Sequence, residues 1–441
     1  MEDAYDLVVI GAGPGGYSAA LTAAAGGLKT LLVEMDAPGG TCLNRGCIPA
    51  KALLHAAHAG DFRKDEALGH AKRVVEGLRK GLSSLFSRRG VEVLQAVAVL
   101  EHGGRLRAGD RVVSARNVVI ATGSEASYPP GLAPDSKRIL GSDDVLEKGV
   151  FPSGEVVVLG GGIVGMEFAD LFSAAGCQVS VVELLPQVLA GIDGEMRREL
   201  LRLFKRRRVR ILTGTACEGA EYRGDRLEVR LSGGEALSCD YLVVVTGRRA
   251  RLEGIDVAAL GLSLNEEKRI AVDDTGRAAD GIYAIGDVAG TGPMLAHAAS
   301  HQGIAVAEYI ATGRRPGKAP VAAVLFTRPE LAWVGMTEEE ARAAFGDEIL
   351  LGRCPMRAIG RAHAIGQTAG LVKVIGASDG RLLGVHALAE NAGEFIGTAQ
   401  LALKLGARLQ DLADLPLPHP TLSEALFEAA RAAAGSPLNT V

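Results

Sequence analysis

Two cysteines stand five positions apart in the stretch "GGTCLNRGCIPAK", residues 39–51. On an ideal α-helix this spacing would hold the Cα atoms of Cys42 and Cys47 roughly 8 to 9 Å apart, whereas a disulfide needs roughly 4.4–6.8 Å. Three glycines in the stretch permit a distorted turn that brings the sulfurs together. A helix is expected from Lys51 onward, and a helix N-terminus favours a thiolate. The pair is therefore either a reversible dithiol or two inert, packed cysteines.

The remaining composition narrows the class of protein. The other four cysteines occur singly and complete no zinc-type pair, so no metal site is expected. A chain of 441 residues with 58 glycines and 48% hydrophobic residues suits several tightly packed α/β domains, and a net charge of −4 does not favour a nucleic-acid partner. The sequence shows neither a signal-peptide pattern nor a membrane-spanning apolar run, so we expect a cytoplasmic protein that does not enter membranes. In that reducing compartment a disulfide is more often catalytic than structural.

The sequence contains one pattern twice, at residues 6–34 and 155–183. Each copy reads as an apolar strand, a Gly-x-Gly-x-x-Gly turn, a helix rich in small residues, and a second apolar strand that ends in glutamate. Such glycines allow a tight turn, close approach of a pyrophosphate and close packing of helix on strand, while the helix N-terminus binds the phosphates. The motif glycines are Gly11, Gly13 and Gly16 in the first copy, and Gly160, Gly162 and Gly165 in the second. Two copies predict two bound dinucleotides.

The position of the cysteines indicates which copy binds which dinucleotide. A dithiol that exchanges electrons with a flavin must touch it, so the first copy is expected to bind FAD and the second a nicotinamide nucleotide. The terminal glutamates, Glu34 and Glu183, are expected to accept hydrogen bonds from ribose hydroxyls. Glu183 would also repel a 2′-phosphate, and no arginine directly follows it. The second nucleotide is therefore predicted to be NAD.

Later segments supply further polar groups. Two strands that lead into Thr-Gly turns, within residues 117–124 and 241–249, are expected to run from each nucleotide domain towards its neighbour. In "GIYAIGDVAG", residues 281–290, Asp287 ends a strand in front of the next helix. Its carboxylate either accepts hydrogen bonds from the ribityl hydroxyls of a flavin or caps that helix.

The last third, from about residue 320, alternates strand-like and helical segments and predicts a separate α+β domain. Near its end, "HPTLSEA" places His419 and Glu424 at the entrance to the final helix, which Thr421 or Ser423 is expected to cap. A histidine followed five residues later by glutamate at a proline turn fits an oriented general base. The alternative is a surface histidine beside a helix cap.

In this order, the segments resemble the flavin-dependent pyridine nucleotide–disulfide oxidoreductases, and among them the dihydrolipoamide dehydrogenases. The similarity covers almost the whole chain and rests on "GAGPGG", "GGTCLNRGCIPAKAL", "GGGIVGMEFA", "IYAIGDVAG", "LAHAA", "WVGMTEEEA" and "HPTLSEA". It implies an α/β fold with two Rossmann-like dinucleotide-binding domains and a C-terminal α+β dimerisation domain. The implied boundaries are 1–145 and 269–319 for the two parts of the FAD domain, 146–268 for the NAD domain, and 320–441 for the dimerisation domain.

The resemblance also implies roles for individual residues. Cys42 would exchange with substrate, Cys47 would form the thiolate next to the flavin, and His419, oriented by Glu424 and contributed by the other subunit of a homodimer, would be the acid–base group. The implied FAD residues are Gly11, Gly13, Gly16, Glu34, Thr41, Lys51, Thr122, Gly123, Asp287 and Ala296. The implied NAD residues are Gly160, Gly162, Gly165, Glu167, Glu183 and Gly247; Glu167 also matches, with Lys51, a pair beside the flavin in relatives.

The implied reaction is oxidation of dihydrolipoamide by NAD⁺ through FAD and a redox-active disulfide, in a homodimer with shared active sites. The implied partner is the lipoyl domain of a 2-oxo acid dehydrogenase or glycine cleavage complex. One departure is Arg45, where relatives usually carry a small apolar residue; a cation there is expected to stabilise a thiolate. The alternatives are a related flavin disulfide reductase for another disulfide, or a non-catalytic flavoprotein that binds lipoyl domains. A scaffold would need neither the cysteine pair nor His419 and Glu424.

Overall fold

A computed structural model describes residues 3–101, 105–317 and 319–439. The chain forms two compact units, each assembled from three stretches. The first unit comprises Met1–Ala56, Arg63–Phe151 and Val244–Gly317, and the second comprises Ala57–Phe62, Pro152–Val243 and Lys318–Val441. Within the described residues, no helix combines the length and the apolar composition needed to cross a membrane.

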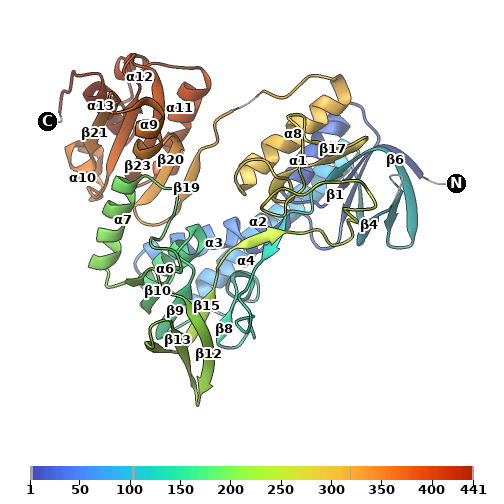
Figure 1. Cartoon of the computed structure of the whole chain (residues 1–441), viewed down its shortest axis with the longest axis horizontal. Helices are drawn as coiled ribbons and strands as arrows, with labels where there is room; N and C mark the ends of the chain where they lie inside the picture. Colours follow the sequence, from blue (N-terminus) through green and yellow to red (C-terminus); the bar gives the residue numbers. More distant parts are fainter. Residues whose placement is uncertain (1–2, 102–104, 318, 440–441) are drawn as a thin grey trace. The chain divides into compact units, whose positions relative to one another are not determined.

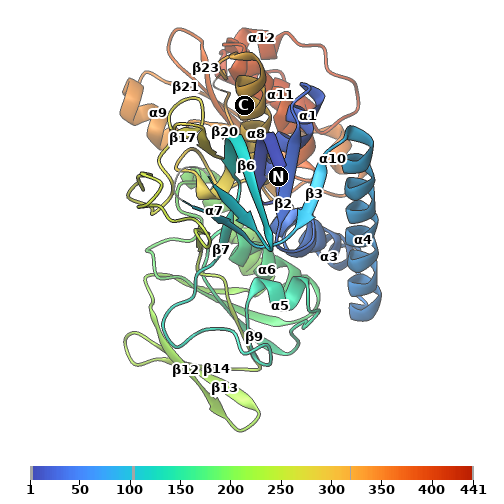
Figure 2. The ribbon, with the colours of Figure 1, turned by 90° about the vertical axis from the view of Figure 1, so that its right-hand side faces the viewer.

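A largely parallel sheet forms the centre of the first unit (Figures 1 and 2). Its strands are β1 (Asp3–Ile10), β2 (Thr30–Glu34), β3 (Glu92–Gln95), β6 (Arg111–Ile120), β17 (Arg277–Ala279) and β18 (Ile282–Ala284). Their order is β17-β18-β6-β1-β2-β3, and β17 pairs antiparallel with β18 at one edge. The hairpin of β4 (Ala98–Leu100) and β5 (Leu106–Ala108) extends from β6. Such strands read as continuous apolar runs because both faces of the sheet are buried.

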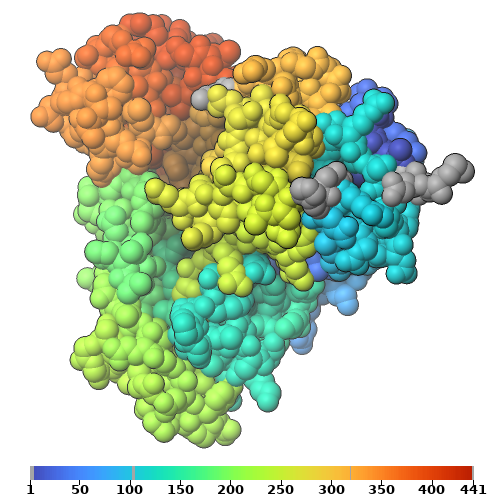
Figure 3. All heavy atoms as spheres, turned by 45° about the vertical axis from the view of Figure 1, so that its right-hand side comes forward, coloured from blue at the N-terminus to red at the C-terminus, as the bar shows by residue number. Residues whose placement is uncertain are grey.

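Helices cover one face of this sheet, and a hairpin with a long segment covers the other. The helices are α1 (Pro14–Ala25), α4 (Lys64–Arg89) and α8 (Ala296–Thr312). The buried residues of α1 are all glycine or alanine, so α8 packs closely beside it (Figure 1). The opposite face packs against the β4–β5 hairpin and residues 252–272, which meet in Figure 3 where the yellow and cyan atoms adjoin.

The remaining elements of the first unit are shorter. They are α2 (Gly40–Arg45), α3 (Cys47–His58), which ends in the second unit, α5 (Ser142–Leu146), β7 (Ser124–Ala126), β8 (Ile139–Leu140), β16 (Arg248–Ala250) and the 3₁₀ turn η2 (Gly286–Val288). β7 pairs antiparallel with β16, so the two strand-to-turn segments that the sequence singled out meet here.

The second unit contains the second copy of the repeated pattern. Its sheet runs β11-β10-β9-β15, built from β9 (Glu155–Leu159), β10 (Gln178–Val182), β11 (Arg210–Leu212) and β15 (Tyr241–Val244). Helix α6 (Ile163–Ala174) joins β9 to β10, and α7 (Gly194–Arg206) precedes β11. A separate antiparallel sheet consists of β12 (Cys217–Arg223), β13 (Arg226–Leu231) and β14 (Ala236–Cys239).

The C-terminal part of the second unit is the predicted α+β domain. Its antiparallel sheet has the order β19-β20-β23-β22-β21, with β19 (Ala323–Leu325), β20 (Glu330–Gly335), β21 (Leu350–Pro355), β22 (Leu371–Gly376) and β23 (Leu382–Ala389). Helices α11 (Ala392–Lys404) and α13 (Glu424–Ala433) pack on this sheet around an alanine-rich core. The smaller elements are α9 (Glu338–Phe345), η3 (Met356–Ala358), α10 (Gly360–Ala364) and α12 (Leu409–Ala413).

Candidate active site

The cysteine pair lies at a break between two helices. Cys42 belongs to α2, Gly46 interrupts the helix, and Cys47 is the first residue of α3. The predicted helix therefore begins at Cys47 rather than at Lys51. A Cβ atom on Gly46 would lie 2.9 Å from the carbonyl oxygen of Thr41, so only glycine lets the chain turn back this closely. The break removes the regular helical spacing that would keep the sulfurs apart.

The two thiols contact each other. A side-chain hydrogen bond with Cys47 and then burial raise the pKa of the Cys42 thiol, because both favour its protonated form. Lys51 opposes this shift through its positive charge. Burial, followed by the charge of Cys42, raises the pKa of the Tyr17 phenol, which places the first turns of α1 beside the dithiol. Cys47 is the more exposed residue of the pair.

Arg45, the cation between the two cysteines along the chain, is paired with two carboxylates. Its guanidinium pairs with Asp36 at 3.0 Å and with Glu147 at 3.3 Å. Burial lowers the pKa of Arg45, but the two carboxylates outweigh burial and raise it overall. Two carboxylates thus hold the guanidinium, and the expectation that it stabilises a thiolate stays a prediction. Lys51 is the cation that favours the Cys42 thiolate.

The first glycine turn has free capacity for a phosphate. Helix α1 begins after Gly13, which has no side chain to cap the helix, so its first amides lack a side-chain acceptor. Glu34 accepts hydrogen bonds from the backbone N–H of Ala12 at 2.7 Å and of Asp36 at 2.9 Å. Its oxygens retain lone pairs for a ribose hydroxyl. The N–H of Gly39 donates to the carbonyl of Ala12 at 2.8 Å and ties the cysteine stretch to this turn. These features fit FAD.

The second glycine turn repeats this arrangement. Helix α6 begins after Gly162, again without a side-chain cap. Glu183 accepts from the N–H of Gly161 at 2.6 Å and of Leu185 at 2.8 Å. No element with a cysteine pair follows this copy along the described chain; residues 184–185 are exposed leucines. The turn therefore fits a dinucleotide as the first one does, and it suits NAD.

Asp287 lies in η2, directly after β18, and its carboxylate is held by a relay. The hydroxyl of Ser124 donates to Asp287 Oδ2 at 2.5 Å, and Arg248 Nε donates to Ser124 Oγ at 2.7 Å. Arg248 Nη2 also donates to the carbonyl of Ser124 at 2.8 Å. Asp287 does not cap α8, whose N-cap residue is Leu295, so the helix-cap alternative was wrong. Sequence reasoning missed Ser124 and Arg248 because neither is near Asp287 along the chain.

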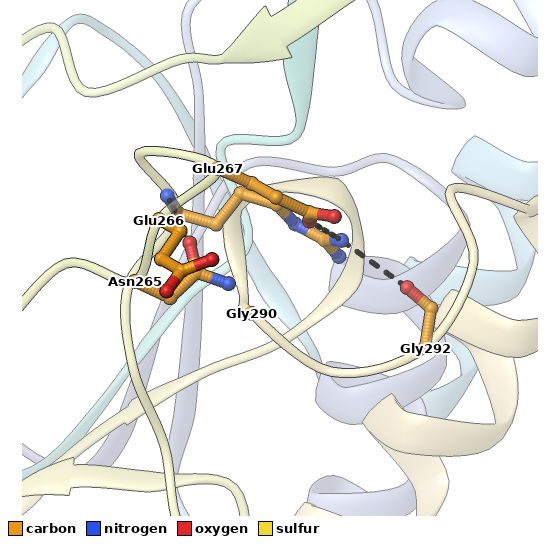
Figure 4. A pocket seen from close by; sticks show the side chains of 6 residues that line it. Asn265, Glu266, Glu267, Gly290 and Gly292 are labelled. Atoms are coloured by element: carbon orange, nitrogen blue, oxygen red, sulfur yellow. Dashed lines mark hydrogen bonds and ion pairs between the residues drawn. The ribbon is translucent and has the colours of Figure 1, made fainter.

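Arg269 supports the same loop from the other side. Its Nε donates to the backbone carbonyl of Asp287 at 3.1 Å, and its Nη1 donates to Gly292 at 3.2 Å and to Glu267 at 3.1 Å. Figure 4 shows Glu267 and Gly292 along a cavity of about 360 Å³ beside this brace. Asn265 and Glu266 add to its lining. Acidic side chains repel phosphate, so we assign this cavity no part in nucleotide binding.

His419 and Glu424 form a hydrogen-bonded pair. His419 Nδ1 lies 2.8 Å from Glu424 Oε1, while the N–H of Thr421 donates to Glu424 Oε2 at 2.9 Å. Burial opposes ionisation, but these two partners outweigh it and lower the pKa of Glu424. The imidazole is 76% exposed and is open to a partner. Neither Thr421 nor Ser423 caps α13 through its hydroxyl, contrary to expectation, because Thr421 donates to the carbonyl of Pro418.

The structure also locates the other residues that the resemblance implied. Thr122 donates through its hydroxyl to the carbonyl of Arg251 at 2.6 Å, and Glu167 accepts from the N–H of Phe326 at 3.0 Å. Their roles, like those of the motif glycines, remain predictions. Thr41 lies in α2, Lys51 in α3, Gly165 in α6 and Ala296 at the start of α8; Gly11, Gly123, Gly160 and Gly247 have positive φ; Gly16 is buried in α1.

Comparison with known proteins agrees with this geometry. Residues 5–303 match the family model "Pyridine nucleotide-disulphide oxidoreductase", and residues 321–430 match its dimerisation domain. The chain is 39% identical to the mitochondrial dihydrolipoyl dehydrogenase of Schizosaccharomyces pombe, covering 97% of this chain and 90% of that protein. It is also 39% identical to the dihydrolipoyl dehydrogenase of Thermus scotoductus, covering 97% of each.

Solved structures show the same fold. The HOCl-induced flavoprotein disulfide reductase RclA of Escherichia coli superposes with a TM-score of 0.89 at 27% identity, covering 97% of this chain and 99% of that one. LpdA of Mycobacterium tuberculosis gives the same TM-score, identity and coverage. The predicted fold class is confirmed, and the dimerisation-domain match supports a homodimer. The chain therefore belongs to the pyridine nucleotide-disulphide oxidoreductase family, whose cofactors are FAD and NAD.

Proposed function

We propose that the chain is a dihydrolipoyl dehydrogenase, which oxidises protein-bound dihydrolipoamide and reduces NAD⁺. The contact between Cys42 and Cys47 at a glycine break, next to a dinucleotide turn, carries this proposal. Relatives named dihydrolipoyl dehydrogenase at 34–39% identity over nearly the full chain support it.

The oxidised pair is a Cys42–Cys47 disulfide. A substrate thiolate attacks Cys42, a mixed disulfide forms, and Cys47 leaves as a thiolate. The second substrate sulfur then displaces Cys42, which closes the cyclic disulfide of lipoamide and completes the two-electron reduction of the pair. The partner subunit's His419 removes the proton from the attacking thiol, and Glu424, bonded to its Nδ1, holds the tautomer in which Nε2 accepts. Lys51 stabilises the Cys42 thiolate by its charge.

The two glycine turns hold the nucleotides. The first turn binds the pyrophosphate of FAD, and Asp287, fixed by Ser124, accepts hydrogen bonds from its sugar-derived hydroxyls. The second turn binds NAD through the amino end of α6 and through Glu183. When bound, these cofactors supply the path for two electrons from the dithiol to NAD⁺ as hydride.

The partner is the lipoyl domain of a 2-oxo acid dehydrogenase or glycine cleavage complex, since a protein-bound dihydrolipoyl group is the substrate. The exposed imidazole of His419 leaves room for such a macromolecular substrate. A cytoplasmic location agrees with this assignment, because disulfides in that reducing compartment are more often catalytic than structural. Cell fractionation followed by immunodetection tests this location.

The function is tested with the purified, flavin-loaded dimer under anaerobic conditions. Mixing with dihydrolipoamide is expected to produce long-wavelength absorbance from a thiolate next to the flavin, and NAD⁺ is expected to remove that absorbance as NADH appears. Cys42→Ser protein is the control, and it should not respond to dihydrolipoamide. If NADH produces the absorbance and dihydrolipoamide does not, the substrate assignment is wrong and the enzyme reduces another disulfide.

A further inference from the structure

The segment that carries the dithiol needs support from outside itself. Helix α2 has six residues, and helices this short are not stable alone. Gly46, which follows it, allows many backbone conformations in the unfolded chain. The distance between the two sulfurs therefore depends on contacts that hold α2 in place.

One such contact is made by Asn44, which is buried at 4% exposure. Its Nδ2 donates to the carbonyls of Ala37 at 3.0 Å and Pro38 at 3.3 Å. Arg79 of α4 donates to Asn44 Oδ1 at 2.5 Å. This fixes Asn44, the fifth of the six residues of α2, and leaves Arg45, the last residue at the C-terminal end before Gly46, to be held by its own contacts.

Arg45 occupies that end and joins two parts of the first unit. Its Nη2 binds Asp36, which precedes α2, and its Nη1 binds Glu147, which ends α5. The N–H of Asp36 donates to Glu34, and Glu34 accepts from the N–H of Ala12 in the first glycine turn. The guanidinium thus connects the break between the cysteines to the nucleotide turn.

We propose that Arg45 is a positioning residue for the Cys42–Cys47 pair: its fork to Asp36 and Glu147 holds the end of α2 so that the two sulfurs stay within bonding distance. The proposal rests on the proposed function in one respect, that this pair is the working dithiol. A guanidinium suits the task because its planar fork reaches two carboxylates at once. A short apolar side chain at this position could make neither ion pair.

The alternative role for Arg45 is an electrostatic one, and two substitutions separate the roles. Arg45→Met removes the fork and the charge. Glu147→Gln removes half of the fork but leaves the positive charge of Arg45 less neutralised. If Arg45 positions α2, both variants weaken the disulfide. If Arg45 acts by its field on a thiolate, the two variants shift the equilibrium in opposite directions.

The experiment measures the equilibrium of the flavin-loaded dimer with reduced and oxidised dithiothreitol. Formation of the Cys42–Cys47 disulfide transfers two electrons and two protons to oxidised dithiothreitol, which becomes the dithiol. Acid quenching, maleimide labelling and mass spectrometry count the remaining thiols. Both variants are expected to lower the equilibrium constant for disulfide formation about 3- to 10-fold, as for partly buried, charge-assisted pairs. Arg45→Lys, which can reach one acid, should fall between Met and wild type.

Arg314→Met is the matched control, since Arg314 makes an exposed ion pair with Glu308 at 3.7 Å. It should leave the equilibrium unchanged. Opposite shifts in Arg45→Met and Glu147→Gln, or no shift in either, would overturn the positioning role. A shift that disappears when flavin content is equalised would also overturn it, because general destabilisation would then explain the result. Dithiothreitol replaces the substrate in this experiment. If both variants lower the equilibrium constant as expected but the wild type shows no activity with dihydrolipoamide, only the proposed function would be rejected.

Discussion

The two copies of the repeated unit, residues 6–34 and 155–183, share a turn but differ in what is attached to it. In both, the terminal glutamate accepts one hydrogen bond from the turn and a second from the backbone two residues beyond itself. In both, the first glycine has a positive φ, 101° for Gly11 and 109° for Gly160. The two turns therefore share the geometry that suits a dinucleotide, while the segments attached to them differ.

The helices of the two copies differ in their buried residues. The buried side of α1 consists of glycine and alanine, which lets α8 approach closely. The buried side of α6 carries phenylalanine, methionine, Glu167 and Asp170. After the first copy the chain enters the α2–α3 break with its dithiol, whereas after the second it enters α7, whose cap is a buried ion pair. We therefore expect the α2–α3 break to serve the chemistry and the capped start of α7 to serve the stability of the fold.

Removing the dithiol should produce the largest effect. Cys47→Ser is expected to lower the turnover number with dihydrolipoamide by at least roughly 10³-fold, because Cys42 then has no disulfide partner and the substrate thiolate has no disulfide to attack. The melting temperature and flavin content should stay near wild type. Steady-state kinetics measure the turnover number, and a thermal melt measures the melting temperature. Cys177→Ser is the control, since burial raises the pKa of the Cys177 thiol to about 11 and makes it inert; activity lost equally in both variants would refute the assignment.

The attachment of the second copy should show the opposite behaviour. Asp193 is fully buried, caps α7 and binds Lys373 of β22 at 2.8 Å. Breaking a buried pair costs about 3 kcal/mol or more, although Glu195 and Glu338 remain near Lys373. Asp193→Asn is therefore expected to lower the melting temperature clearly while the dithiol equilibrium stays at its wild-type value.

The same pair predicts a pH dependence. Burial raises the pKa of Asp193, but the hydrogen bond and charge of Lys373 outweigh it and lower the pKa overall. A carboxyl with a lowered folded pKa stabilises the protein above its unfolded pKa of about 4, and the gain disappears as pH falls through the folded value. Wild type should lose melting temperature below about pH 4. In Asp193→Asn this acid slope should be shallower; an unchanged slope would contradict the ion pair.

The proposed proton acceptor, His419, comes from neither copy, and its loss should have an intermediate effect. His419→Gln is expected to slow dihydrolipoamide oxidation by roughly 10²-fold, the usual contribution of a general base. Flavin absorbance and NADH-dependent reduction of the Cys42–Cys47 disulfide should remain normal, because the glutamine leaves both nucleotide turns intact. Stopped-flow spectra of the two half-reactions separate these effects. Wild-type turnover in this variant would exclude His419 as the base.

Much of this site follows from local sequence, and the remainder depends on long-range contacts. The glycine turns, Glu34, Glu183 and the His419–Glu424 pair lie within short motifs whose geometry the backbone fixes, so sequence reasoning located them. Ser124 meets Arg248, and Arg45 meets Glu147, only after folding brings distant segments together. The ion pairs of Arg45 were missed for this reason: the sequence shows the two nearby cysteines but not Glu147, which follows α5.

Replacing the equivalent glutamates, Glu34 and Glu183, by glutamine tests the comparison of the two turns most directly. The expected effect is the smallest of those predicted. Glutamine at Glu34 or Glu183 keeps one acceptor oxygen and places an NH₂ group against a backbone N–H, so each turn loses one charge-assisted bond. A loss of about 1.4 kcal/mol corresponds to about 10-fold in affinity. Glu34→Gln should weaken FAD binding by that factor and leave the KM for NAD⁺ unchanged. Glu183→Gln should raise the KM for NAD⁺ by that factor and leave FAD binding unchanged. Flavin fluorescence measures FAD binding, and initial rates measure the KM for NAD⁺. Glu34 is 8% exposed, so its variant should also lose more melting temperature. If Glu34→Gln instead raised the KM for NAD⁺, the assignment of the two turns would be inverted.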